Sequence, residues 1–222
     1  MSFEMSFEGL SHGEFVNSDA YQALQDGLTF NEITPDLLQD ISKNIMDTFG
    51  YVCPDIYQTN ILEGQFFNNA AMETIFSEGQ VIDGNLLYDQ NFIWHIGQQY
   101  GVDAVSGVIA HEMGHQITNV VYTGAELELS NWHNELCADY ISGIVTRLAD
   151  LSPDSMHDFY AGEAWMPSES HPAGGLRTEA FDKGYEWASH SMNNTFAEFI
   201  LDSPSTIQNL LEENVVNYFT TY

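Results

Sequence analysis

The feature that most constrains this chain is the stretch His111-Glu112-Met113-Gly114-His115, which follows the apolar run Val102 to Ala110. Residues four apart lie on one face of a helix, so the two histidines present their imidazoles to a single point, with Glu112 beside them. Zn²⁺ binds neutral imidazole nitrogen, and a catalytic zinc site usually has three protein ligands. The stretch therefore predicts a core helix that carries two metal ligands. The alternative is two polar residues on the solvated side of such a helix.

A candidate third ligand lies beyond His115, in the stretch Asn134-Glu135-Leu136-Cys137-Ala138-Asp139-Tyr140. An apolar helical pattern continues to Leu148, so Glu135 and Asp139 are expected on one face of a second helix, one turn apart. The carboxylate of Glu135 can complete a His₂Glu site, and Asp139 can orient a ligand histidine by accepting its other N–H. The alternative is a solvated acidic helix face.

The HEMGH and NELCAD stretches together resemble the gluzincins, the thermolysin-like zinc peptidases, in spacing as well as residue type. In that family the third ligand is a glutamate, and an aspartate one turn later supports a histidine. The resemblance implies one Zn²⁺ per chain, held by His111, His115 and Glu135 and supported by Asp139. It also implies an endopeptidase that uses a zinc-activated water, with Glu112 as general base and then general acid.

Two other ligand sets would also include histidine. The metzincin pattern needs a third histidine six residues past the second, but Val121 stands there, and Thr118 replaces the required glycine. His133 is a stronger rival because imidazole is a good zinc ligand, although it lies about 200° from Glu135 around a helix. Otherwise His133 is expected at the start of the helix or at the rim of the site.

Charge limits the possible partners. The chain has 33 acidic and 4 basic residues among 222, a formal net charge of −29. Such a surface repels phosphate backbones and anionic lipid headgroups, so neither nucleic acid nor a membrane is an expected partner. Cationic substrates would be attracted, although solubility or a salty habitat also explains the acidity.

The bulk properties predict one soluble domain. A hydrophobic content of 44% is ample for a core. No apolar run approaches a membrane span and the start lacks a secretory signal, which favours the cytoplasm but leaves a mature exported form open. Cys53 and Cys137 are expected as buried thiols. We expect a flexible or strand-adding arm at residues 1–30 and a single zincin-like domain at residues 31–222.

The expected fold is α+β, with a small, twisted, mostly antiparallel sheet on the HEMGH helix and a mainly helical C-terminal half. Five local patterns support it: a helix from Thr34-Pro35 to Phe49, a hairpin turn at Asp83-Gly84, the HEMGH helix from an N-cap at Asp103 to near Val120, a helix from Ser152-Pro153, and closing helices at 191–201 and 204–219.

In gluzincins the edge strand upstream of the active helix receives the peptide as an added antiparallel strand. The resemblance therefore implies a peptide or protein substrate bound near residues 85–89. The earlier Asn69-Ala70 resembles an Asn-Ala element in soluble relatives of the heat-shock membrane zinc proteases. A loop closed by asparagine side chains is the plain alternative.

A second informative stretch runs from Ser170 to Arg177. It resembles the Ser-His-Pro…Arg segment of soluble zinc peptidases of the heat-shock family, and the tail of the bacterial neutral zinc metallopeptidases. The resemblance implies that His171 hydrogen-bonds the oxyanion or gates the cleft; a loop residue before Pro172 is the alternative. Arg177 is expected to pair with an acidic helix end rather than to act on the substrate.

Two other functions stay open. The chain could be a catalytically silent, zinc-bearing binding protein on a gluzincin scaffold, or an acidic interaction protein such as a nucleic-acid mimic. The complete set of His111, Glu112, His115 and Glu135 argues against catalytic decay. Metal content separates the mimic from the other two, because a mimic needs no stoichiometric zinc.

Overall fold

A computed structural model of the chain describes residues 34–49, 51, 55–58, 61–62, 65–66, 69–123, 129–162, 171–193 and 204–220. The expected arm at residues 1–30 and Cys53 lie outside these residues. The elements of the described part are α3 (Pro35–Thr48), β1 (Asp55–Gln58), β2 (Ile61–Leu62), β3 (Gln65–Phe66), β4 (Ala70–Ser77), β5 (Gln80–Tyr88), α4 (Gln90–Tyr100), α5 (Val102–Tyr122), α6 (Asn131–Leu148), α7 (Pro153–Gly162), α8 (Gly174–Asn193), α9 (Pro204–Leu211) and the π-helical turn η3 (Glu212–Val216).

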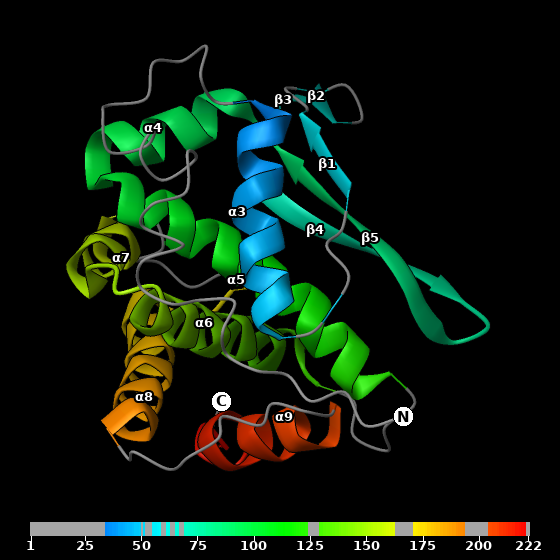
Figure 1. Ribbon diagram of the computed structural model, residues 1–222, viewed down its shortest axis with the longest axis vertical. Helices are drawn as coiled ribbons and strands as arrows, with labels where there is room; N and C mark the ends of the chain where they lie inside the picture. The colour runs from blue at the N-terminus through cyan, green and yellow to red at the C-terminus, as the bar shows by residue number, and fades with distance from the viewer. Residues whose placement is uncertain are drawn as a thin grey trace.

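A three-stranded sheet packs against α5, and most of the other described residues lie in helices (Figure 1). The strand order is β1-β5-β4, in which β5 runs antiparallel to β4 and parallel to β1. Strands β2 and β3 form a separate antiparallel pair. The α+β class and the helical C-terminal half are confirmed. The sheet is mixed rather than mostly antiparallel, because β1 adds to β5 in the parallel direction.

Residues 85–88 belong to the central strand of this sheet. Leu86 of β5 lies opposite Ile56 of β1 on one side and Met72 of β4 on the other. Asp89, the next residue, is the N-cap of α4. The expectation that residues 85–89 form an edge strand is therefore wrong, because β1 covers the side of β5 that would have been open. The edge beside α5 belongs to β4.

The hairpin of β4 and β5 turns at Glu78 and Gly79, whose φ angles of 52° and 77° fit a two-residue type I′ turn. The predicted turn at Asp83-Gly84 is wrong, since both residues lie within β5. Gly84 is needed there for a different reason. A Cβ at this position would come within 2.8 Å of Oε1 of Gln116, whose Nε2 donates a hydrogen bond to the carbonyl of Asp83.

Helix α5 begins two residues earlier than expected. Its N-cap is Gly101 rather than Asp103. The positive φ of Gly101, 89°, lets the chain turn directly from α4 into α5. Asp103 instead accepts a hydrogen bond of 3.0 Å from the backbone N–H of Ser152, and so ties the start of α5 to the segment before α7.

Helix α6 lies very close to both of its main neighbours. At its crossing with α5, a Cβ on Gly114 would come within 2.8 Å of the Cα of Ala138. At its crossing with α8, a Cβ on Gly143 would lie 2.0 Å from the carbonyl oxygen of Phe181, and one on Gly184 would lie 1.9 Å from that of Tyr140. Glycine at these positions lets three helices pack backbone against backbone around the core.

Other local predictions are confirmed. Thr34 caps α3 by accepting a hydrogen bond from the backbone N–H of Leu37, and Pro35 opens that helix. Helices α7 and α9 begin at Pro153 and Pro204. The helix expected at 191–201 falls mostly outside the described residues, and residues 191–193 are the end of α8. Among the described helices, none has the length and apolar character needed to cross a membrane.

Candidate metal centre

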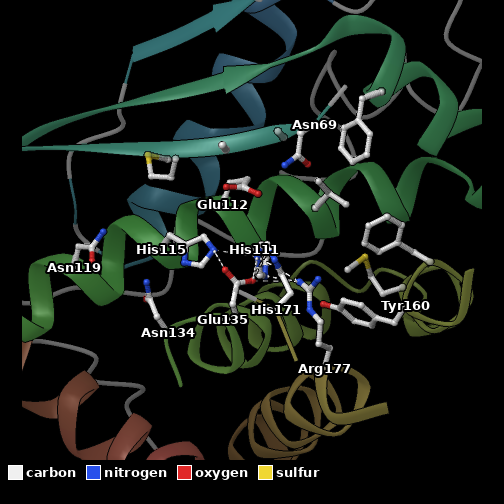
Figure 2. Close-up of a pocket in the computed structure, with 17 residues that line it drawn as sticks. Asn69, His111, Glu112, His115, Asn119, Asn134, Glu135, Tyr160, His171 and Arg177 are labelled. Carbon is white, nitrogen blue, oxygen red and sulfur yellow. Dashed lines mark hydrogen bonds and ion pairs between the residues drawn. The ribbon is translucent and has the colours of Figure 1, made fainter. Parts of the chain in front are cut away.

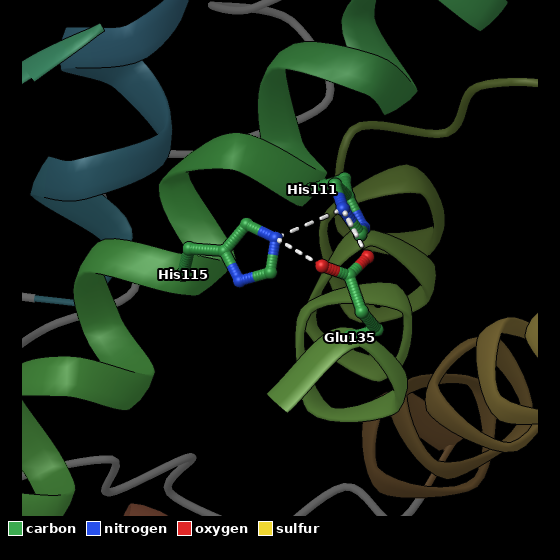
Figure 3. Close-up of side chains that lie close together, drawn as sticks. All are labelled: His111, His115 and Glu135. Atoms are coloured by element: carbon green, nitrogen blue, oxygen red, sulfur yellow. Dashed lines mark hydrogen bonds and ion pairs between the residues drawn. The ribbon is translucent and has the colours of Figure 1, made fainter. Parts of the chain in front are cut away.

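The two histidines lie one turn apart on α5, and Glu135 reaches them from α6. Both His111 and Glu135 are buried, with exposed fractions of 6% and 9%. The close crossing at Gly114 and Ala138 brings the helices near enough for the side chains to meet. Figure 3 shows the two imidazoles and the carboxylate converging on one point. The predicted spacing along two helices therefore produces a real cluster in space.

The distances within this cluster match those expected around a small tetrahedral cation. Nε2 of His111 and Nε2 of His115 are 3.1 Å apart, and each lies 3.4 Å from a different carboxylate oxygen of Glu135. Ligand atoms bound at about 2.05 Å to tetrahedral zinc lie about 3.3 Å from one another. Among the described residues, Glu135 Oε2 is also a buried oxygen with no hydrogen-bond partner. The atom types and their separations fit a Zn²⁺ site, and the unpaired Oε2 of Glu135 is an acceptor that such an ion would satisfy.

Asp139 supports the cluster from one helical turn beyond Glu135. Its fully buried carboxylate accepts from Nδ1 of His111 at 2.8 Å, from the hydroxyl of Tyr160 at 2.8 Å, and from Nε and Nη2 of Arg177, both at 2.8 Å. The Arg177 guanidinium also lies over the ring of Tyr160, 5.0 Å from its centroid. Arg177 therefore pairs with a carboxylate, as predicted, but with one in the middle of α6 rather than at a helix end.

Glu112 lies on the side of the pocket nearest the sheet (Figure 2). Its side chain is buried and accepts a hydrogen bond from the backbone N–H of Met72 on β4. Burial raises the pKa of Glu112 to about 7, and the neighbouring charge of Glu135 contributes in the same direction. A carboxyl with a pKa near neutrality can both accept and release a proton at physiological pH.

The charges of the cluster strongly affect one another. Burial alone would lower the pKa of His111, but the charge and hydrogen bond of Asp139 raise it to about 10. Burial lowers the pKa of His115 to about 4, and the charge of His111 adds to the effect. Burial alone would raise the pKa of Glu135, but its interactions with His111, His115 and His171 lower it to about 2. The carboxylate of Glu135 is therefore ionised, and its charge is balanced by the imidazoles that face it.

His171 lies at the rim of the same pocket. Its Nε2 is 3.4 Å from Oε2 of Glu135, and 46% of its side chain is exposed. Burial of the remainder lowers the pKa of His171, which favours the neutral imidazole. His171 therefore lies where its side chain reaches both solvent and the cluster of His111, His115 and Glu135.

The pocket around these residues has a volume of about 340 Å³. Strand β4 supplies one wall through Ala70, Ala71 and Met72, with Asn69 just before it. The lining also includes the apolar side chains of Phe92, Val108, Met156 and Phe159 and the polar side chains of Asn119 and Asn134. The cluster thus lies in a cleft between the edge strand and helix α6.

Sequence reasoning missed Tyr160, the residue of α7 that donates to Asp139. No spacing rule links it to the motifs, because its contact depends on how α7 packs against α6 and α8. The polar pocket residues Asn119 and Asn134 were also missed, although each is adjacent in helix position to a predicted ligand. Asn119 could have been found by extending the ligand face of α5 by one turn beyond His115. Asn134 directly precedes Glu135 and lies about 100° from it around α6, so the same rule does not find it.

The rival ligand His133 is not part of the cluster. It stands in the first turn of α6, where its backbone N–H and its Nδ1 both contact the N-cap residue Ser130. His133 therefore lies at the start of the helix, which is one of its two expected positions. Cys137 is a buried free thiol, as predicted, and burial raises its pKa.

Comparison with known proteins adds no assignment. The chain matches no protein-family model, no curated protein and no solved structure.

Proposed function

We propose that the chain is a zinc-dependent peptidase of the gluzincin type, with one Zn²⁺ held by His111, His115 and Glu135. The observation that carries the proposal is the convergence of two Nε2 atoms and a carboxylate at 3.1 to 3.4 Å, with a second carboxylate, Glu112, in the same cleft. A zinc ion supplies Lewis-acid polarisation of the scissile carbonyl and lowers the pKa of water toward about 7.

Glu112 is the proposed general base and acid. Its pKa of about 7 suits it to take a proton from the attacking water and deliver it to the departing amine nitrogen. The hydrogen bond from the Met72 N–H holds the carboxylate at the wall of the cleft formed by β4. This positions the proton carrier beside the edge along which a substrate would lie.

His171 and Arg177 are the proposed positive or hydrogen-bonding groups opposite Glu112. Nη2 of Arg177 lies 4.0 Å from Oε2 of Glu135, and its guanidinium is held in place by both oxygens of Asp139. A fixed donor costs little reorganisation when negative charge develops on a substrate oxygen. The more exposed His171 can approach from the rim. Arg177 thus combines support of Asp139 with a fixed charge at the cleft.

The proposed substrate is a peptide segment in extended form. The strand available for its addition is β4, not β5 as the sequence had implied, because β5 is paired on both sides. Residues Ala70 to Met72 of β4 line the cleft. An antiparallel segment added here would be held through its backbone, with its scissile bond carried past Glu112.

The test combines metal content with cleavage. We expect about one zinc per chain by elemental analysis, and cleavage of casein or mixed peptides that a chelator abolishes. Glu112→Gln should retain zinc but lower kcat by about 10²–10⁴-fold, because it removes the proton carrier and no ligand. Glu135→Ala should lose or loosen zinc.

Each of the alternatives gives a different result in these assays. Zinc without cleavage of any peptide would favour a silent zinc-bearing binding protein. The absence of zinc would contradict the proposed peptidase and favour an acidic interaction protein. A Glu112→Gln variant with full activity would contradict the role of Glu112 even if the zinc were present.

A further inference from the structure

The hairpin of β4 and β5 extends well beyond the cleft and projects away from the helices (Figure 1). Its distal part, residues 73–83, carries two large apolar side chains that face solvent, Phe76 and Ile82, with exposed fractions of 56% and 62%. They are close in the sheet register, because Phe76 pairs with Val81 and a bulge there leaves Ile82 as the additional residue. Large exposed apolar side chains grouped in this way are typical of binding surfaces.

Negative charge surrounds these apolar side chains. Glu73, Glu78 and Asp83 are all exposed, and residues 69–88 contain no lysine or arginine. The basic residues lie elsewhere and have their own partners: Lys43 pairs with Asp47, Arg147 with Asp150, Arg177 with Asp139, and Lys183 lies over the ring of Tyr218. The distal hairpin is therefore both apolar and anionic.

The distal hairpin is also tied to the helix that carries the histidines. The hydroxyl of Thr74 donates to Oε1 of Gln116 at 2.9 Å and accepts from Nδ2 of Asn119 at 2.8 Å. Gln116 additionally holds the carbonyl of Asp83 at 3.2 Å. Since Gln116 and Asn119 follow His115 on α5, these bonds fix the direction in which the hairpin leaves the cleft.

The polarity of β4 defines which part of a substrate would reach the distal hairpin. From Met72 at the cleft to Phe76 is four residues of strand, or about 14 Å. Strand β4 runs from the cleft toward the turn, so an antiparallel segment added to it runs from the turn toward the cleft. The residues opposite Phe76 therefore lie on the N-terminal side of the scissile bond.

We propose that the distal hairpin is an extended binding site for substrate, and that it selects unfolded segments carrying apolar and basic residues about four positions N-terminal to the cleaved bond. This inference rests on the proposed peptidase function. Apolar residues of the segment contact Phe76 and Ile82, while lysine or arginine residues pair with Glu73, Glu78 and Asp83. The protein then acts on long, basic chains in preference to short peptides. A second copy is a poorer occupant, because two molecules of charge −29 repel each other.

The experiment compares two labelled peptides. One carries alternating lysine and leucine residues on the N-terminal side of a cleavable segment. The other is the same peptide shortened at its N-terminus, so that it begins about two residues before the scissile bond. Binding is measured by fluorescence anisotropy on zinc-loaded Glu112→Gln protein, which leaves the peptides intact. Cleavage is measured as kcat/KM on protein with Glu112 in place.

The double variant Phe76→Ser/Ile82→Ser should weaken binding of the long peptide, and its kcat/KM, by about tenfold or more. The short peptide should be unaffected. Glu78→Gln/Asp83→Asn should also weaken the long peptide and flatten the dependence of its kcat/KM on salt. The matched control is Glu186→Gln/Glu213→Gln, which changes the net charge by the same amount at exposed helical positions. It should leave the difference in binding and in kcat/KM between the long and the short peptide unchanged.

Equal losses for the two peptides, or no loss for either, would overturn the inference. A dimer in light scattering that Phe76→Ser/Ile82→Ser dissociates would also overturn it, since a second copy would then cover the hairpin. Binding of the long peptide that depends on the hairpin, with no cleavage of either peptide by the zinc-loaded protein, would refute the peptidase and leave the binding surface supported.

Discussion

Four hydrogen bonds converge on the carboxylate of Asp139, from His111, from Tyr160 and twice from Arg177. At full burial a carboxylate is costly unless each oxygen is well paired, and the charges of Arg177 and His111 keep the pKa of Asp139 well below its usual range. At the scale of single residues, this side chain orients His111 and fixes Arg177 at the same time.

Replacing Asp139 by asparagine should weaken metal binding by about 10- to 100-fold, because His111 loses the anion that fixes its tautomer and orientation. Competition against a chelating dye measures this affinity. Tyr160→Phe removes only one of the four bonds and is the matched control, with a smaller loss expected. Wild-type metal affinity in Asp139→Asn would show that His111 is positioned by other contacts.

The predicted set His111, Glu112, His115, Glu135 and Asp139 is brought together at the pocket because its spacing obeys helix periodicity, which a sequence displays directly. Tyr160 could not be found in this way. Its hydroxyl meets Asp139 through the packing of α7, a tertiary contact between residues 21 positions apart. The side chains that hold a predicted residue in place are harder to infer than the residue itself.

At the scale of elements, the sequence did not predict the order of the strands in the sheet. The sequence predicted a strand at residues 85–89, which is the second half of β5, but it contains no information on whether a short strand such as β1 pairs with that strand. The turn was misplaced because Asp83-Gly84 and Glu78-Gly79 have similar turn chemistry, and only packing distinguishes them. Gly84 is a contact for Gln116, whereas Gly79 has the positive φ.

Helix α6 offers a direct test of element packing. Gly143→Ala should lower the free energy of unfolding by about 1–3 kcal/mol or more, because the added methyl group would overlap the backbone of Phe181 on α8. Gly184→Ala should behave similarly against Tyr140. Urea unfolding monitored by circular dichroism measures both.

The control is Gly175→Ala, since nothing lies within 4 Å of a Cβ at that position of α8. This variant should keep or slightly raise stability, because alanine favours a helix over glycine. A Gly143→Ala variant as stable as the control would contradict the close contact between α6 and α8.

At the scale of the whole molecule, several tyrosines of the described part are buried in the core. Burial raises the pKa of Tyr88 to about 12, and it also raises the pKa values of Tyr140 and Tyr160 above their usual value. The alkaline behaviour of this chain is therefore a property of its core.

Stability should fall as the pH rises above about 10. The pKa of Tyr88 is higher in the folded than in the unfolded state, so its contribution is complete below the unfolded value of 10 and is lost as the pH approaches 12. The loss from this residue is up to about 3 kcal/mol. Urea unfolding at pH 8, 10 and 11 measures the slope, and Tyr88→Phe should reduce it. An unchanged slope in Tyr88→Phe would contradict the contribution of this residue.

The contacts of Asp139 have a consequence for how the molecule comes apart. The carboxylate belongs to α6, and its donors come from α5, α7 and α8, so four helices meet at one buried charge. Releasing any one helix would leave an ionised group without its partner inside the core, which is more costly than exposing it. Partial opening is thereby disfavoured, and these four helices are coupled into a single cooperative unit that is either assembled or lost together.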